Sequence, residues 1–108
     1  MNAQFKKGVL ELCVLSLLLE RDQYGYELTE TLADKMEIAE GTIYPILRRL
    51  HAEGYFSAYI QESSGGPPRK YYSLTPKGRL AQAELAADWV HFAGQVSELI
   101  GGAVLEQN

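Results

Sequence analysis

Apolar residues recur at helical spacing along two segments at the start of the chain. Residues 5–19 are apolar on most sides, which is typical of a helix buried in a core. Asp22 and Gln23 interrupt this pattern, and apolar residues then recur at intervals of two to four residues as far as Glu37. The spacing predicts a first helix over 5–19 and a second helix that follows Tyr24 and ends near Glu37.

A third segment, residues 40–50, has the pattern of an amphipathic helix. Its four apolar residues lie at i, i+3, i+4 and i+7, which places them on one helical face. Because Pro45 is tolerated only near the start of a helix, the regular part is expected to begin close to Thr42 or to be distorted before it. Gly54 supplies a C-terminal stop. The four apolar residues are Ile43, Ile46, Leu47 and Leu50.

The second half of the chain predicts one β-hairpin and then a long helix. Residues 55–61 and 69–74 are rich in aromatic and β-branched side chains, and they flank turn-forming residues at 63–68. Thr75 and Pro76 are residue types favoured at the N-cap and at the first position of a helix. This helix can run as far as residue 100, after which two glycines follow.

Two short helices, a turn, a third amphipathic helix and a hairpin, in this order, predict a winged helix-turn-helix. We expect a mainly α fold with a small β-hairpin (α+β). Residues 1–75 would form the winged helix-turn-helix domain, and residues 76–108 the C-terminal dimerisation helix and tail. In such a domain the third helix fits the major groove of DNA, and the hairpin reaches the neighbouring phosphates or minor groove.

The composition fits one small domain with a single core. The chain has 108 residues, which leaves no room for a separate catalytic domain beside that core. Its longest apolar stretch, residues 12–19, is far shorter than the roughly 20 residues that span a bilayer, and no signal peptide is expected. The single cysteine, Cys13, fits a reducing compartment. We therefore expect a cytoplasmic protein without membrane contact.

The formal net charge of −4 conceals a basic middle part. Residues 1–43 hold four basic and eight acidic groups, and residues 81–108 hold four acidic groups and no basic one. Residues 44–80 hold six basic groups against two acidic ones. Because proteins that bind nucleic acids neutralise phosphates with clustered lysine and arginine, this middle part is the expected contact region for double-stranded DNA.

The predicted third helix and the hairpin offer side chains suited to DNA. Arginine suits phosphate or guanine contacts, and the hydroxyls of threonine and tyrosine suit further polar contacts. An isolated Arg-Arg pair is more often only the solvated face of a helix, but the basic hairpin that follows favours a DNA contact. The candidates are Thr42, Tyr44, Arg48 and Arg49 on the helix and Arg69 and Lys70 on the hairpin.

Four motifs occur in order between residues 5 and 80. They are Tyr24-Gly25-Tyr26-Glu27-Leu28, the run 40–50 (EGTIYPILRRL), Glu53-Gly54 and the run 69–78 (RKYYSLTPKG). Through these motifs the chain resembles the PadR-like transcriptional regulators. The resemblance implies a homodimeric bacterial repressor whose recognition helices enter successive major grooves of an inverted-repeat operator. The DNA contacts that it implies are Thr42, Tyr44, Pro45, Arg48, Gly66, Arg69 and Lys70.

The last predicted helix carries more apolar surface than packing against one small domain requires. One stripe repeats at intervals of 4, 3, 4 and 3 residues, which is a heptad seam. A second stripe adjoins it. We therefore expect this helix to form a homodimer. The seam consists of Leu85, Trp89, Phe92, Val96 and Leu99, and the second stripe of Ala86, Val90, Ala93 and Ile100.

Trp89, the only tryptophan, has two interpretations. It can be an ordinary residue of the seam or core, or it can line a ligand site. Some short PadR-like proteins with little beyond this one helix use a tryptophan at the matching position to line an aromatic cavity between protomers. The resemblance therefore implies a planar aromatic small molecule as effector. The residues expected to form the wall are Phe5, Leu12, Trp89, Ala93 and Val96.

The chain offers no pattern that suits an enzyme, a cofactor or a metal site. His51 and His91 lie 40 residues apart without a companion at ligand spacing, and no serine is paired with a general base. We expect a ligand-responsive transcriptional repressor. Two other classes stay open: a winged-helix adaptor that binds an acidic protein, and a protein that binds aromatic small molecules without DNA regulation.

Overall fold

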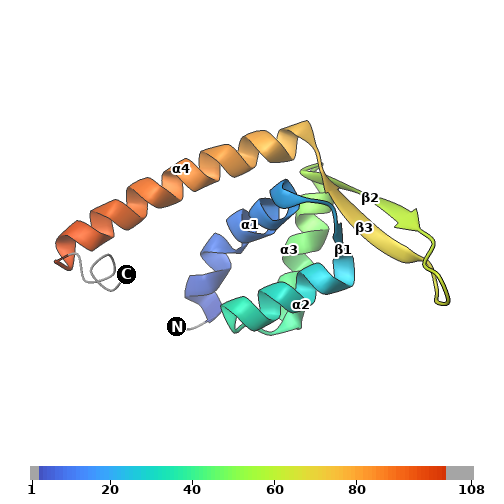
Figure 1. Ribbon diagram of the computed structural model, residues 1–108. Coiled ribbons are helices and arrows are strands. Elements are labelled where there is room, and N and C mark those ends of the chain that lie inside the picture. The colour runs from blue at the N-terminus through green and yellow to red at the C-terminus, as the bar shows by residue number, and fades with distance from the viewer. Residues whose placement is uncertain (1–2, 102–108) are drawn as a thin grey trace.

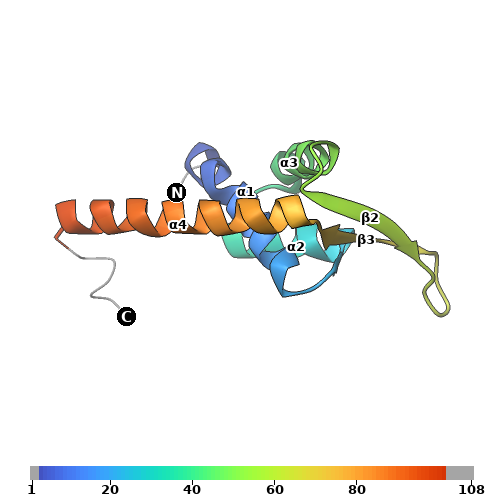
Figure 2. The same ribbon diagram turned by 90° about the horizontal axis from the view of Figure 1, so that it is seen from above.

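The computed structural model describes residues 3–101, with side chains from residue 9 onward. Within this range the elements follow in the order α1 (Ala3–Glu20), β1 (Gln23–Tyr24), α2 (Gly25–Met36), α3 (Glu40–Ala52), β2 (Phe56–Gln61), β3 (Arg69–Leu74) and α4 (Pro76–Leu99). The first three helices form a bundle beside the hairpin (Figure 1). Figure 2 shows that the β2–β3 hairpin and α4 project from this bundle in opposite directions. The predicted α+β winged helix-turn-helix with a long last helix is confirmed.

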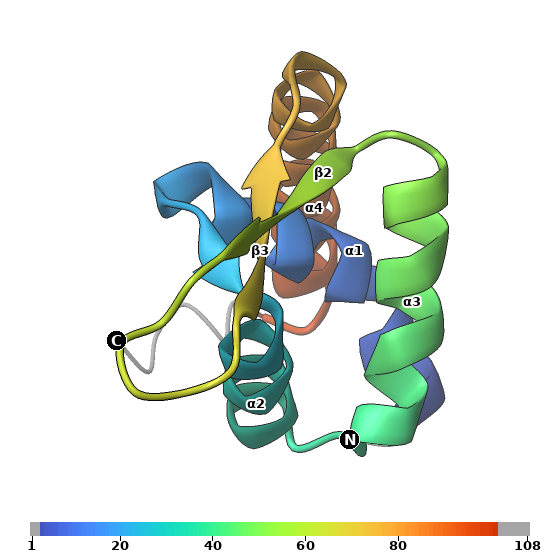
Figure 3. The same ribbon diagram turned by 90° about the vertical axis from the view of Figure 1, so that its right-hand side faces the viewer.

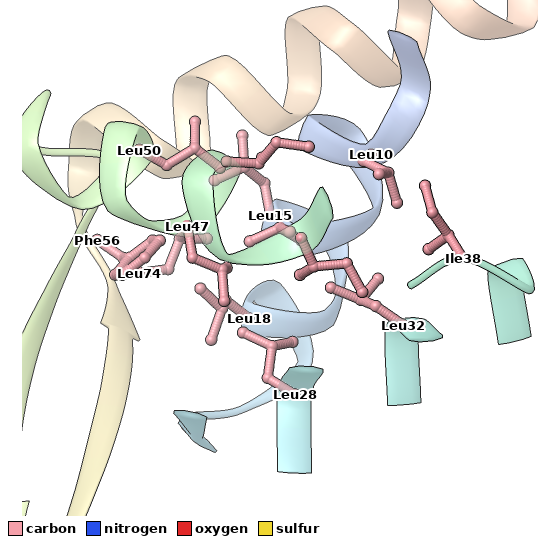
Figure 4. Packing of buried hydrophobic residues seen from close by; sticks show 13 residues of the cluster. Leu10, Leu15, Leu18, Leu28, Leu32, Ile38, Leu47, Leu50, Phe56 and Leu74 are labelled. Carbon is pink, nitrogen blue, oxygen red and sulfur yellow. The ribbon is translucent and has the colours of Figure 1, made fainter. Parts of the chain in front are cut away.

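The core lies where α1, α2 and α3 meet the base of the hairpin (Figure 4). Its apolar side chains are at most 9% exposed, and each such burial stabilises the fold by about 1.5–3 kcal/mol. All four apolar residues of the predicted amphipathic helix are among them, so that pattern is confirmed. The core consists of Leu10, Val14, Leu15, Leu18, Leu28, Leu32, Ile38, Ile43, Ile46, Leu47, Leu50, Phe56 and Leu74.

α1 is the helix against which the others pack. It contributes four residues to the core, and α4 lies along another of its faces. Gln82 of α4 donates a hydrogen bond from Nε2 to Ser16 Oγ of α1 at 3.2 Å. In the part of the chain that the structure describes, no helix combines the length and apolar content needed to cross a membrane.

The start of α3 differs from the prediction. The helix begins at Glu40, and Pro45 lies inside it instead of in its first turn. Since proline has no N–H, the carbonyl of Gly41 receives no helical hydrogen bond from position 45. Gly41 is exposed to solvent, so water can replace that bond. The exposure of Gly41 explains why the helix tolerates Pro45 two residues deeper in the helix than a start at Thr42 would place it.

The sheet has one strand more than the predicted hairpin. β1 pairs antiparallel with β3, which gives the strand order β1-β3-β2. β1 is only two residues long, which is too short to produce an alternating pattern in the sequence. Gln23, interpreted as a break between helices, is buried in this strand and donates from Nε2 to the carbonyl of Leu17 at 3.2 Å. β1 therefore ties the hairpin to the end of α1.

The junction between α3, the hairpin and α4 is fixed by polar contacts. Thr75 is the predicted N-cap: its Oγ1 accepts from the Gly78 N–H at 3.1 Å and donates to the Gly54 carbonyl at 2.7 Å. Lys77 Nζ donates to the Glu53 carbonyl at 2.6 Å, where a cation suits the negative end of the α3 dipole. A Cβ on Gly78 would lie 2.0 Å from the carbonyl oxygen of Tyr55, so only glycine fits there.

Candidate nucleic-acid interface

The face of α3 opposite the core carries the predicted DNA-binding residues. Tyr44, Pro45 and Arg48 are exposed, and Thr42 is half-buried. These positions alternate with the buried residues of the same helix, because one amphipathic pattern fixes both faces. Within the described residues, Arg48 takes part in no hydrogen bond or ion pair. Its guanidinium is therefore available to an external partner.

Arg49 has different surroundings from Arg48. Its guanidinium forms an ion pair with Glu11 of α1 through Nη2, and a second with Glu53 through Nη1 at 3.4 Å. The hydrogen bond and the negative charge of Glu11 raise the pKa of Arg49 above its usual value. The structure thus places Arg49 on the flank of α3 that faces α1, held by two carboxylates of its own chain.

The hairpin places Arg69 and Lys70 at the start of β3. Both side chains are exposed, and strand alternation directs them to opposite faces of the sheet. The guanidinium of Arg69 lies 4.9 Å from the ring centre of Tyr24, within the range of a cation–π contact. Lys70 pairs in register with Ile60 and lies on the same sheet face as Tyr72.

The tip of the hairpin is a tight turn. Gly65 has φ +77°, a conformation that favours glycine. The Gly66 N–H donates to the Ser63 carbonyl at 3.4 Å, and Ser63 Oγ donates to the Pro67 carbonyl at 2.7 Å. The exposed Gly66, a predicted DNA contact, is therefore presented at the turn between the two strands.

An aromatic cluster connects α3 to the hairpin. His51 of α3 stacks on Phe56 at 5.5 Å between ring centres, and Phe56 packs against Tyr72 at 4.6 Å. Burial raises the pKa of the Tyr72 hydroxyl above its usual value, and nearby Tyr44 adds to the rise. Figure 3, viewed from the hairpin tip, shows α3 beside the hairpin. The sequence did not reveal this role of His51, because it depends on packing between distant segments.

The opposite face of the sheet carries a second aromatic group. The ring of Tyr71 lies 5.7 Å from Tyr59 and 5.8 Å from Tyr24. The Tyr59 hydroxyl donates to Asp22 Oδ2 at 2.7 Å, and this hydrogen bond raises the pKa of Tyr59. Tyr71 and Tyr72 therefore lie on different faces of β3, as the alternation of side chains along a strand requires. These contacts join the hairpin to the segment that leads from α1 into α2.

A cleft of about 210 Å³ lies between α1 and α4 beside Trp89. Trp89 and Leu12, two of the predicted ligand-binding residues, line it together. Ala93 and Val96 are not among its lining residues, and the side chain of Phe5 lies outside the described residues. The lining that the sequence did not indicate consists of Val9, Glu11, Leu85, Asp88 and Phe92.

The apolar seam of α4 divides into a packed part and an exposed part. Leu85 packs against the core, whereas Phe92 is 54% and Leu99 87% exposed. Trp89 lies between these parts with its ring centre 6.4 Å from that of Phe92. Of the second stripe, Val90 and Ile100 are also exposed. An apolar stripe therefore continues along α4 beyond the domain that covers its first turns.

Comparisons with known proteins agree on one family. A sequence model of the PadR-like family of transcriptional regulators matches residues 14–84. An uncharacterised protein of Lysinibacillus sphaericus is 34% identical over 98 residues, which are 87% of this chain and 86% of that protein. A transcriptional regulator of Mycobacterium tuberculosis is 32% identical over 82 residues, 75% of this chain and 76% of the relative.

Solved structures show the same similarity. A PadR-like transcriptional regulator from Bacillus cereus superposes with a TM-score of 0.82 at 37% identity, over 91% of this chain and 97% of that one. A Streptococcus transcriptional regulator superposes with a TM-score of 0.80 at 34% identity, over 91% and 98% of the two chains. The similarity thus extends over the winged helix-turn-helix and most of α4.

Proposed function

The chain belongs to the PadR-like family of transcriptional regulators, and we propose that it is a homodimeric repressor that binds an inverted-repeat operator and responds to a planar aromatic effector. The observation that carries this proposal is the exposed face of α3. It presents Tyr44 away from the core together with Arg48, which has no partner among the described residues, next to a hairpin with Arg69 and Lys70. A helix of this kind fits the major groove, and the hairpin beside it can reach phosphates.

The proposed DNA contacts divide into two groups. Arg48 and Tyr44, at the centre of the exposed α3 face, would contact base edges, while the hairpin would contact the backbone. Arg49 would contribute only after leaving its carboxylate partners. The complete proposed set is Thr42, Tyr44, Pro45, Arg48, Arg49, Gly66, Arg69 and Lys70.

The exposed stripe of α4 supports the homodimer. Large contiguous apolar patches on a small protein mark interaction sites, and the 4-3 spacing of this stripe suits a second helix of the same kind. A twofold axis between two paired α4 helices would relate the two copies of α3 in the dimer. Two recognition helices related in this way match two half-sites of an inverted repeat.

The cleft beside Trp89 supports the effector. Its aromatic and aliphatic lining suits a flat aromatic ring, with Trp89 and Phe92 on one side and Leu12 on the other. Its volume of about 210 Å³ is below the roughly 300–1,000 Å³ of typical ligand pockets. Because it opens beside the proposed dimer stripe, a second copy of α4 would enlarge and close it.

A DNA-binding measurement with a matched pair of variants tests the proposal. We expect the protein to bind DNA upstream of its own coding sequence more tightly than a scrambled duplex of equal length. Arg48→Ala is expected to weaken binding about tenfold, the effect of losing one bidentate base contact. Arg21→Ala removes instead an exposed arginine that lies outside the basic middle part of the chain, and it serves as the control.

The outcomes separate the proposal from its alternatives. Equal affinity for the two duplexes at every salt concentration would contradict an operator-binding regulator, and so would an Arg48→Ala variant that binds like the wild type. An adaptor or a small-molecule-binding protein without DNA regulation would give one of those results. A selective shift that depends on Arg48 supports the repressor.

A further inference from the structure

Glu11 lies where three helices meet. It lines the cleft beside Trp89, together with Asp88 of α4. It also lines a second cleft with Leu50 of α3, and a third with Pro45 and Arg49. Glu11 lines all three of these clefts, whereas Leu85 and Asp88 line the Trp89 cleft and the second cleft but not the third, which contains Arg49.

The Glu11 carboxylate is bound to Arg49 by an exchangeable contact. The two side chains remain 36% and 46% exposed. An ion pair in such a position contributes little net stability, because water competes for both charges. Arg49 also retains Glu53 as a second partner at 3.4 Å. Glu11 can therefore change partner without leaving Arg49 unpaired.

The charged residues that line the Trp89 cleft are both acidic. They are Glu11 and Asp88, and the rest of its lining is apolar. A planar aromatic cation against Trp89 would bring its positive charge close to these two carboxylates. It would then attract the same Glu11 carboxylate that binds Arg49. A neutral ring of equal shape would not compete in this way.

We propose that Glu11 couples the effector cleft to the recognition helix, because a cationic ligand in the Trp89 cleft competes with Arg49 for its carboxylate. This inference rests on the effector site proposed above. The exchange gives the ligand different interactions with two states of the α3 surface, one with Arg49 bound to Glu11 and one with Arg49 bound to Glu53 alone. Such a difference is what any ligand needs in order to shift a conformational equilibrium.

The test is a titration with 9-aminoacridine, a planar cation at neutral pH, followed by the fluorescence of Trp89. DNA is left out because this dye binds to it. If Arg49 competes for Glu11, Arg49→Gln tightens dye binding by about two- to fivefold, the effect expected from losing an exposed ion pair. Glu11→Gln weakens dye binding, and adding Arg49→Gln to that variant causes no further change.

Two controls make the result specific. Arg48→Gln removes the same charge from the adjacent residue, which has no contact with Glu11, and should leave dye affinity unchanged. Acridine, the uncharged ring, should bind equally to the wild type and to Arg49→Gln. Circular dichroism of each variant checks that the fold is retained.

The titration distinguishes a failure of the proposed effector site from a failure of the proposed role of Glu11. If neither dye quenches Trp89 in the wild type, the effector site is wrong and the coupling falls with it. If 9-aminoacridine binds but Arg49→Gln behaves like Arg48→Gln, the effector site stands and the role of Glu11 is wrong. Additive effects of Glu11→Gln and Arg49→Gln would also overturn the coupling.

Discussion

Arg48 and Arg49 show how one helical position changes the surroundings of a side chain. Residues of α3 that differ by one lie about 100° apart around the helix axis. Arg48 therefore points away from the core and has no partner in the part of the chain that the structure describes, while Arg49 reaches Glu11 and Glu53. Both were predicted DNA contacts from the sequence, because an arginine pair gives no sign of an acidic residue 38 positions earlier. The ion pair makes Arg48 the stronger candidate for direct contact with bases.

Gly78 lets the start of α4 approach the Tyr55 carbonyl closely, and its replacement gives a prediction. Gly78→Ala would bring a methyl group 2.0 Å from the Tyr55 carbonyl oxygen, so the backbone must move. We expect the free energy of unfolding in urea to fall by about 2 kcal/mol or more.

The control is the same glycine-to-alanine substitution at a position where the added Cβ meets no neighbouring atom. A Cβ on Gly41 of α3 would meet no atom within 4 Å, so Gly41→Ala should change the free energy of unfolding by less than about 1 kcal/mol. Equal effects of the two substitutions would show that the packing of α4 against Tyr55 does not constrain the fold.

At the scale of elements, the helices and the hairpin could be predicted because their signals are local. These signals are the spacing from Ile43 to Leu50, the turn residues before β3 and the Thr75-Pro76 pair, and each lies within a short stretch of sequence. β1 and the α3–α1 ion pair could not be predicted, since each joins segments that are distant in the sequence. The candidate site follows the same division: its exposed α3 face was predictable, while Glu11, Asp88 and the role of His51 required the fold.

The stripe of α4 gives a prediction about assembly. Ala81 and Leu85 pack against the core, so removing the whole helix would expose that core as well as the stripe. A substitution within the exposed part of the stripe tests dimerisation without exposing the core. Phe92→Glu places a charge in the centre of the seam and is expected to convert a dimer into a monomer, measured by size-exclusion chromatography with light scattering.

A matched charge on the other side of α4 controls for solubility. Ala87 is exposed and lies outside both stripes, so Ala87→Glu should remain dimeric. A Phe92→Glu variant with the mass of two chains, or a wild type with the mass of one, would contradict dimerisation through this surface.

In the molecule as a whole, the basic residues and the acidic end of α4 lie in different regions. The basic residues of the middle part belong to α3, the hairpin and the first turn of α4, whereas α4 beyond Arg79 carries no basic residue. The hairpin and the far end of α4 point in opposite directions (Figure 2). An overall charge of −4 therefore coexists with a basic middle part that carries the proposed DNA contacts. Such a field disfavours random adsorption to DNA and favours approach through α3 and the hairpin.

The sharpest test of whether two copies of α3 bind one operator is a hydroxyl-radical footprint on the DNA upstream of the protein's own coding sequence. We predict two protected half-sites of inverted sequence, with centres about 34–36 Å or a multiple apart along the duplex. Arg48→Ala should lose both half-sites at the same protein concentration. A single protected segment, or protection by Arg48→Ala equal to that of the wild type, would contradict binding of one operator by two copies of α3.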